Sequence, residues 1–290
     1  MEKASEYTAM LNSYSSVVNL ETIVIQVLIL FVSSYGIIKP NFVIAQGYGL
    51  SIVVFGATLI VLLLRYAFTK GMSHAVTVLI AESLLLLAYG FRLASFIGNR
   101  NKKDFYIKNR QGAFNKPVSL LVTIPLWTVV SFLYLCYGLP ALIGYRALVN
   151  GYRFNVVLHL VGTLVMLFGL VIESVADSQK SQSKQEKPNR FCDCGLYRYC
   201  RMPNYFGELV YWTGCVLSCI GDEMSALQIG FCLFGIVCAY YIMLHSATAL
   251  DKRQFDNYHS DSEYMKYRCE VPVLFPFSHW YSMIKVDKMD

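Results

Sequence analysis

Seven long apolar segments constrain this chain more than any other feature of its sequence. They cover roughly residues 17–38, 49–68, 74–97, 118–143, 154–176, 204–221 and 225–247. About 20 mostly apolar residues are enough for a helix to cross a bilayer. The chain is also 56% hydrophobic and only 15% charged, whereas soluble domains average about 25% charged residues. The segments therefore predict an all-α, multi-pass transmembrane helical bundle with about seven spans.

Lysine and arginine are distributed unevenly between alternate loops. Loops 39–48, 98–117 and 177–203, with the tail after residue 247, contain 19 of them, whereas the N-terminus and the other three loops contain 5. Loops rich in these residues stay on the cytosolic side of a membrane. We therefore expect a luminal or external N-terminus, with residues 1–16 as a polar tail without the pattern of a signal peptide, and a cytosolic C-terminus.

Charge and cysteine content argue against two classes of function. The net charge of +6 is modest, so we expect no nucleic-acid partner. Cys192, Cys194 and Cys200 form a cluster, but no histidine lies near it and its spacing fits no common zinc pattern. We therefore expect ordinary reduced thiols and no metal.

Three polar side chains share one face of the third apolar segment. Glu82, Tyr89 and Arg92 are spaced i, i+7, i+10, which places them on the same side of a helix. Intramembrane charges usually face a partner or a cavity. The face therefore either contains a Glu–Arg pair that stabilises the helix or lines a substrate cavity.

The fifth apolar segment ends in a second polar stripe. Glu173, Asp177 and Lys180 follow at i, i+4 and i+7. Taken alone, this stripe is typical of a solvated helix end with an Asp177–Lys180 pair.

The stretch RYCRMPNYFGELVYW, residues 198–212, introduces the sixth segment. Arg198, Arg201, Asn204, Tyr205 and Glu208 follow one another at short intervals around a proline that would occupy the first helical turn. A helix N-terminus binds anions, and the planar fork of arginine suits phosphate. The alternative is anchoring to lipid headgroups by interfacial arginine and tyrosine.

The tail after the last segment also contains basic and aromatic residues. Lys252 and Arg253 are followed by Tyr264 and Tyr267 and then by an apolar, proline-containing patch. This pattern predicts a short amphipathic helix that lies back on the bundle and covers a cytosolic pocket.

These motifs together resemble the C-terminal domain family of the steroid 5-alpha-reductases. The matching pieces are Glu173-x-x-x-Asp177-x-Gln179-Lys180, the stretch GLYRYCRMPNYFGE at 195–208, Tyr264-x-x-Tyr267 and Phe275-Pro276. The resemblance spans about residues 80–280. It implies an endoplasmic-reticulum membrane reductase that uses NADPH to deliver hydride to an electron-poor C=C bond of a sterol, enoyl or polyprenoid lipid. Residues 17–146 would form the lipid-substrate side and residues 147–290 the cofactor-binding part.

The resemblance also assigns roles to single residues. Asp177 would bind the adenosine end of the cofactor, Arg198 and Arg201 its phosphates, and Asn204 and Glu208 the nicotinamide carboxamide. The full set of expected cofactor-binding residues is Glu173, Asp177, Lys180, Arg198, Arg201, Asn204, Tyr205, Glu208 and Arg253. The expected catalytic residues are Glu82 and Tyr89, as the pair that polarises a carbonyl, together with Glu208.

Met202 departs from the family pattern, which usually has histidine at that position. Methionine neither hydrogen-bonds a phosphate strongly nor shuttles a proton. A non-catalytic, lipid-binding member of the fold is therefore one alternative. Another is a membrane methyltransferase of the isoprenylcysteine type, which shares the arginine–proline–tyrosine outline and binds S-adenosylmethionine.

Overall fold

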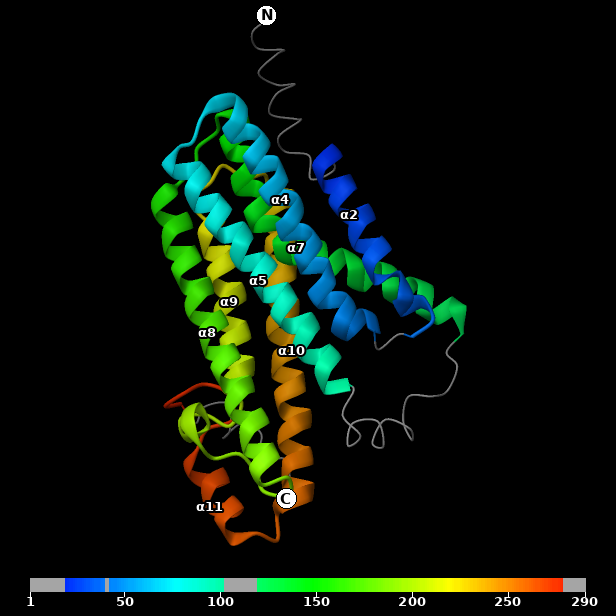
Figure 1. Cartoon of the computed structure of the whole chain (residues 1–290), viewed down its shortest axis with the longest axis vertical. Helices are drawn as coiled ribbons and strands as arrows, with labels where there is room; N and C mark the ends of the chain where they lie inside the picture. Colours follow the sequence, from blue (N-terminus) through cyan, green and yellow to red (C-terminus); the bar gives the residue numbers. More distant parts are fainter. Residues whose placement is uncertain (1–18, 40–41, 102–118, 279–290) are drawn as a thin grey trace, which may run out of the picture. The chain divides into compact units, whose positions relative to one another are not determined.

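The structure is a computed structural model that describes residues 19–39, 42–101 and 119–278. All regular secondary structure in these ranges is helical, and they contain no strand (Figure 1). The helices are α2 Leu20–Ser33, η1 Ser34–Ile37, η2 Val43–Gly47, α4 Tyr48–Lys70, α5 His74–Asn101, α7 Leu120–Asn150, α8 Val156–Glu186, η3 Gly195–Arg198, α9 Pro203–Cys219, α10 Ala226–Tyr258 and α11 Ser262–Glu270. The predicted all-α class is confirmed for these residues. The predicted polar tail at 1–16 lies outside them.

Six of the described helical segments are long and apolar enough to cross a membrane, which makes the chain a multi-pass membrane protein by length and composition. They are α2 with η1, η2 with α4, α5, α7, α8 and α10. Helix α9 has 17 residues, or roughly 25 Å at about 1.5 Å per residue, slightly less than the roughly 30 Å hydrocarbon core. The seventh span and the orientation of the termini stay predictions.

Helix α7 extends further than the sequence indicates. Pro125 and Pro140 both lie inside it, and the helix continues to Asn150 rather than ending near 143. Gly151 follows with φ 70°, the left-handed conformation that commonly terminates helices. Nearly all residues from Ser131 to Ala147 are buried, and a membrane helix tolerates proline where neighbouring groups compensate the lost hydrogen bond.

Other helix ends agree with the predicted signals. Helix α9 begins at Pro203, as expected, and the Ser225 hydroxyl accepts a hydrogen bond from the Gln228 amide at 3.3 Å, so Ser225 caps α10. The expected tail helix is α11, capped by Asp261. Lys252 and Arg253, however, lie on the last turns of α10, which runs to Tyr258.

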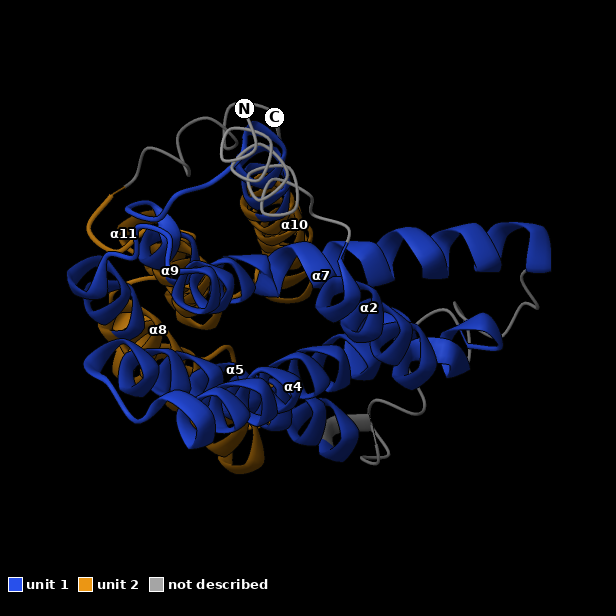
Figure 2. Cartoon of the chain, turned by 90° about the horizontal axis from the view of Figure 1, so that it is seen from above, with its two compact units in different colours: residues 1–163, 215–235 blue, residues 164–214, 236–290 orange. Residues whose placement is uncertain are grey.

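The chain divides into two compact units (Figure 2). Unit 1 comprises residues 1–163 and 215–235, and unit 2 comprises residues 164–214 and 236–290. The boundaries between the units fall inside α8, α9 and α10.

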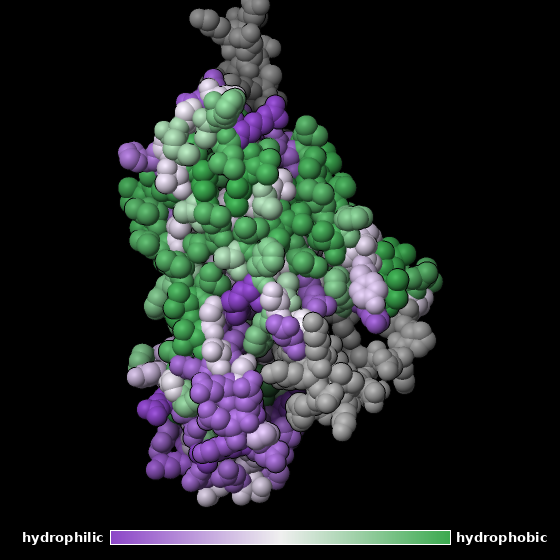
Figure 3. Space-filling model, viewed as in Figure 1, coloured by the Kyte–Doolittle hydropathy of each residue, from purple (hydrophilic) through white to green (hydrophobic). Residues whose placement is uncertain are grey.

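Unit 1 is built around closely packed α4 and α5. A Cβ atom on Gly90 of α5 would lie 2.5 Å from the carbonyl oxygen of Gly49 on α4, so the two backbones touch where both residues are glycine. Much of the outward surface of this unit is apolar, as Phe31, Val61 and Phe68 illustrate. Figure 3 shows this hydrophobic surface over α4 and α5. Exposed apolar side chains of this kind suit contact with lipid.

Unit 2 combines an apolar cluster with a polar end. Met202, Leu209, Ala247, Val273 and Leu274 form the buried cluster, which joins the start of α9 to α10 and to the segment after α11. Hydrophilic residues gather around α11 in Figure 3. All nine residues predicted to bind a cofactor lie in this unit.

Candidate functional site

The centre of the candidate site is the crossing of α8 and α9 in unit 2. A Cβ atom on Gly207 would lie 2.7 Å from the amide nitrogen of Glu173 and 2.8 Å from the carbonyl oxygen of Gly169. The helices therefore touch through backbone atoms, as small residues permit at membrane-helix interfaces. The contact places Glu173 beside the turn that contains Glu208, and their exposed fractions are 4% and 8%.

Asp177 continues the acidic face of α8 one turn beyond Glu173, and it is 7% exposed. It lies near Tyr197 of η3, whose pKa is raised well above its ordinary value mainly by burial, with further contributions from Cys192 and Asp177. Lys180, three residues further, is half-buried. The predicted stripe is therefore an inward-facing surface rather than a fully solvated helix end.

Asn204 and Tyr205 occupy the first turn of α9. Both side chains are partly buried, and Tyr205 packs against the apolar cluster of unit 2. The side-chain oxygen of Asn204 is buried and has no hydrogen-bond partner within the described part of the chain. Because a buried carbonyl oxygen without a partner is costly, this atom is well suited to accept a hydrogen bond from a ligand.

The predicted phosphate-binding arginines differ in their surroundings. Arg201 is buried, its guanidinium forms an ion pair with Asp251, and its Nε donates to the Val271 carbonyl oxygen at 3.1 Å. Arg268 also pairs with Asp251, at 3.4 Å. The Arg201 side chain is thus engaged inside the protein, where it joins the start of α9 to α10 and to the segment after α11.

Arg198 and Arg253 are exposed, by contrast. Neither has an ion-pair partner among the residues that the structure describes. Their guanidinium groups are therefore available for an anionic ligand.

The predicted Tyr-x-x-Tyr pair of α11 serves the packing of unit 2. Tyr264 is fully buried, its ring lies 5.3 Å from that of Phe191, and burial together with the charge of Asp251 raises its pKa to about 12. Tyr267 donates a hydrogen bond to the Tyr197 carbonyl oxygen at 2.8 Å. These contacts hold α11 against the loop that precedes α9.

Met202, at the position where the resemblance leads us to expect histidine, lies in an apolar environment. It is 1% exposed within the apolar cluster of unit 2. A histidine at this position would need polar partners in an apolar setting. In this chain the position therefore belongs to the core.

Glu82 belongs to a buried polar network in unit 1. One carboxylate oxygen accepts from the Ser218 hydroxyl at 2.8 Å, and the other lies 2.9 Å from Nδ1 of His159. Nε2 of His159 lies 2.9 Å from a carboxylate oxygen of Asp222, whose second oxygen accepts from the Asn155 amide at 3.0 Å. The imidazole is therefore held between two carboxylates.

The packing around His159 fixes the position of its ring. The Phe154 ring stacks on the imidazole with centroids 4.3 Å apart and planes at 11°. A Cβ atom on Gly144 would lie 2.5 Å from Cε1 of His159. Because the ring is confined on both sides, the orientation of Glu82 is fixed as well.

Tyr89, the second predicted catalytic residue of α5, is also fully buried. Its hydroxyl lies 3.1 Å from that of Tyr48, and the Arg92 guanidinium lies 6.0 Å from the centre of its ring. The contacts of Glu82 with His159 and Ser218 were not predicted. A substrate carbonyl that binds to Glu82 or Tyr89 would have to replace a hydrogen-bond partner present in this structure.

Sequence reasoning missed His159, Asp222 and Ser218. The signal for His159 was available, because a histidine inside an apolar segment requires a polar partner. The identity of that partner was not, because Asp222 and Glu82 lie 63 and 77 residues away in the sequence.

Comparison with known families covers both of these regions. The family model described as "Protein of unknown function (DUF1295)" matches residues 41–271. The chain belongs to this family. No curated protein and no solved structure matches the chain. The part shared with DUF1295 includes the Glu82 network and the crossing of α8 and α9.

Two further properties concern metals and cysteines. The described residues include no group of three or more His, Cys, Asp or Glu side chains arranged to hold a metal ion. All nine cysteines are free thiols. Among the described residues of this DUF1295 member, therefore, neither a metal site nor a disulfide accounts for the buried carboxylates, the carboxamides and the exposed cations.

Proposed function

We propose that this DUF1295 member is a membrane reductase that transfers hydride from NADPH to an activated C=C bond of a lipid, as the resemblance to steroid 5-alpha-reductases implies. The observation that supports this most directly is the buried side-chain oxygen of Asn204, which has no partner among the described residues. A nicotinamide carboxamide offers two N–H donors, and the carboxylates of Glu173 and Glu208 lie on the neighbouring turns. These groups fit the hydrogen-bonding pattern of that end of the cofactor.

The exposed arginines fit the other end of the same molecule. Arg198 lies in η3, just before α9, and Arg253 lies near the end of α10, both within unit 2. Two guanidinium groups and the N-terminus of α9 provide the positive charge that phosphates require. Bound NADPH would supply the hydride, and the protein would supply orientation and charge compensation.

The proposed roles of Glu82 and Tyr89 concern the lipid. A protonated carboxyl or a tyrosine hydroxyl donates a hydrogen bond to a carbonyl oxygen, which makes the conjugated C=C bond more electrophilic. His159 and Ser218 hold both oxygens of the Glu82 side chain. We therefore assign His159 and Ser218 as positioning residues for Glu82.

A membrane methyltransferase is the second candidate, and the buried carboxylates favour it. S-adenosylmethionine contains an ammonium and a sulfonium group and no phosphate. Glu173, Asp177 and Glu208 are each less than 9% exposed, and buried carboxylates attract a cationic ligand. The exposed Arg198 and Arg253 favour the anionic dinucleotide instead.

A ligand titration distinguishes these candidates. Purified protein in detergent is mixed with NADPH, NADH or S-adenosylmethionine, and the unfolding temperature is measured. A ligand at about 100 times its Kd stabilises the folded state by roughly 2.7 kcal/mol. We expect a rise with NADPH, and a smaller rise in the Asn204→Ala variant. The matched control Asn257→Ala changes an exposed asparagine of α10.

Each alternative outcome supports a different function. A rise with S-adenosylmethionine alone would identify a methyltransferase. A rise with none of the three ligands would favour the non-catalytic, lipid-binding protein.

A further inference from the structure

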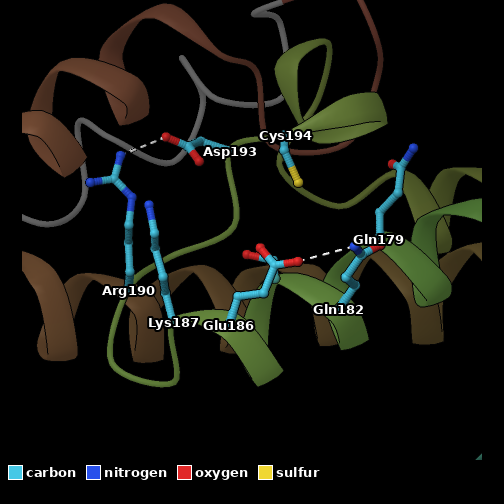
Figure 4. A pocket seen from close by; sticks show the side chains of 8 residues that line it. Gln179, Gln182, Glu186, Lys187, Arg190, Asp193 and Cys194 are labelled. Carbon is cyan, nitrogen blue, oxygen red and sulfur yellow. Dashed lines mark hydrogen bonds and ion pairs between the residues drawn. The ribbon is translucent and has the colours of Figure 1, made fainter.

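A polar pocket of about 240 Å³ lies in unit 2, between the C-terminal end of α8 and the loop that follows it (Figure 4). Its lining residues are Gln179, Gln182, Ser183, Glu186, Lys187, Arg190, Asp193 and Cys194. A second hollow of about 420 Å³ adjoins it and shares Lys187 and Arg190. Of the lining residues only Gln179 belongs to a family motif, and none has a role assigned above.

The walls of the pocket are held by hydrogen bonds. The Lys184 ammonium group donates to the Arg190 carbonyl oxygen at 2.5 Å and to the Tyr258 hydroxyl at 2.8 Å. The side-chain oxygen of Gln179 accepts from the Leu196 amide at 2.9 Å. The loop is thus tied to both α8 and α10.

Arg190 and Asp193 compensate each other's charge, whereas Glu186 and Lys187 have no ion-pair partner among the described residues. Arg190 donates to Asp193 at 2.8 Å and to Glu263 at 2.6 Å, and these hydrogen bonds raise its pKa. Glu186 accepts a hydrogen bond from the Gln182 carboxamide at 3.0 Å. The Lys187 ammonium group differs, because the described part of the chain offers it no ion-pair or hydrogen-bond partner. Lys187 is therefore the lining cation that is left for an anionic ligand in the described part of the chain.

We propose that this pocket binds the 2′-phosphorylated ribose of NADPH, with Lys187 contacting the 2′-phosphate; this rests on the proposed function. The pocket is smaller than the roughly 300–1,000 Å³ typical of sites for whole ligands, so it suits one end of a dinucleotide. Lysine binds phosphate as a point charge. A carboxylate in that role would select a free 2′-hydroxyl, but Glu186 and Asp193 are engaged by Gln182 and Arg190.

The position of the pocket along the chain agrees with this assignment. Asp177, the residue assigned to the adenosine end by resemblance, precedes the lining residue Gln179 by one turn or less on the same helix. Figure 4 shows Gln179 and Gln182 at one side of the pocket and Lys187 and Arg190 at the other. In this assignment the carboxamides would face the adenosine end and the cations the 2′-phosphate.

The test compares two nucleotides that differ only in the 2′-phosphate. The Kd values of NADPH and NADH are measured for the wild type, Lys187→Ala, Lys187→Glu and the control Lys266→Ala, whose side chain is exposed on α11. We expect Lys187→Ala to weaken NADPH about tenfold or more, the effect of one charge-assisted hydrogen bond. NADH binding should not change, and Lys187→Glu should weaken NADPH further.

The outcomes separate this inference from the function on which it rests. A wild type that binds neither nucleotide, or shows no preference for NADPH, overturns the proposed function and this inference with it. A wild type that prefers NADPH while Lys187→Ala keeps the same preference overturns this inference alone. Equal weakening of both nucleotides by Lys187→Ala also contradicts it, because the lost contact would then not involve the 2′-phosphate.

Discussion

Replacing Gly207 with alanine should open the crossing of α8 and α9. The new methyl group would lie 2.7 Å from the Glu173 amide nitrogen and 2.8 Å from the Gly169 carbonyl oxygen. Both atoms belong to the backbone of a helix, so neither moves away as the end of a flexible side chain would. The two helices themselves have to separate.

The size of the effect follows from these distances. Ordinary contacts of a Cβ atom begin near 3.4 Å, and the shorter distances at Gly207 are 2.7 and 2.8 Å, so the helices must part by about 0.7 Å. Overpacking of this kind costs about 1–3 kcal/mol. At about 2–4 °C for each kcal/mol in a chain of this size, the unfolding temperature should fall by roughly 2–12 °C.

Thermal unfolding in detergent provides the measurement, with Gly230→Ala as the matched control. Gly230 is also a helical glycine, but a Cβ atom there would meet nothing within 4 Å. Its replacement should leave stability unchanged or raise it slightly, because alanine favours the helix by up to about 1 kcal/mol. If Gly207→Ala and Gly230→Ala shift the unfolding temperature equally, the close crossing does not exist as described.

Two further predictions concern buried polar groups. His159→Gln should lower the free energy of unfolding by about 3–5 kcal/mol, because the shorter amide leaves Glu82 or Asp222 without a buried partner. An unfolding temperature within roughly 2 °C of the wild-type value would contradict this prediction. Burial raises the pKa of the Cys200 thiol from 9.0 to about 12. Its contribution to stability is therefore complete below pH 9 and is lost between pH 9 and 12 as the unfolded thiol ionises first. In the Cys200→Ala variant, the unfolding temperature should therefore change less with pH over this range. Labelling provides a second measurement. At roughly pH 8, a maleimide should modify the exposed Cys269 and leave the buried Cys200 unmodified.

The sequence was a good guide to the helices because their main signal is local. A long apolar run determines a membrane helix with little help from its neighbours, and the proline signal at 203 placed the start of α9 correctly. The end of α7 was missed because Pro140 normally disfavours a helix interior. In α7 the surrounding residues are buried on all sides, and this packing outweighs the local preference.

The candidate site was only partly accessible to sequence reasoning. Spacing along one helix placed Glu173 and Asp177 on a common face, but it did not show that this face points inward. The contact of Gly207 with the turn of Glu173 depends on how two helices cross, which a single helix does not encode. The same holds for the pairing of Glu82 with His159, whose residues belong to α5 and α8.

Arg201 shows why spacing alone does not separate ligands from structural cations. Arg198 and Arg201 lie three residues apart before the same helix, and their sequence context makes them equivalent as phosphate ligands. In the structure the Arg201 side chain is 1% exposed and paired with Asp251, while its backbone amide donates to the Pro272 carbonyl oxygen at 2.8 Å. Removing one partner of a buried ion pair costs about 3–5 kcal/mol, because the other charge stays buried. An Arg201 variant could therefore lose nucleotide binding for either of two reasons: the 271–272 segment detaches from the start of α9, or a phosphate contact is lost. Phosphate recognition is better tested by substituting the exposed Arg198.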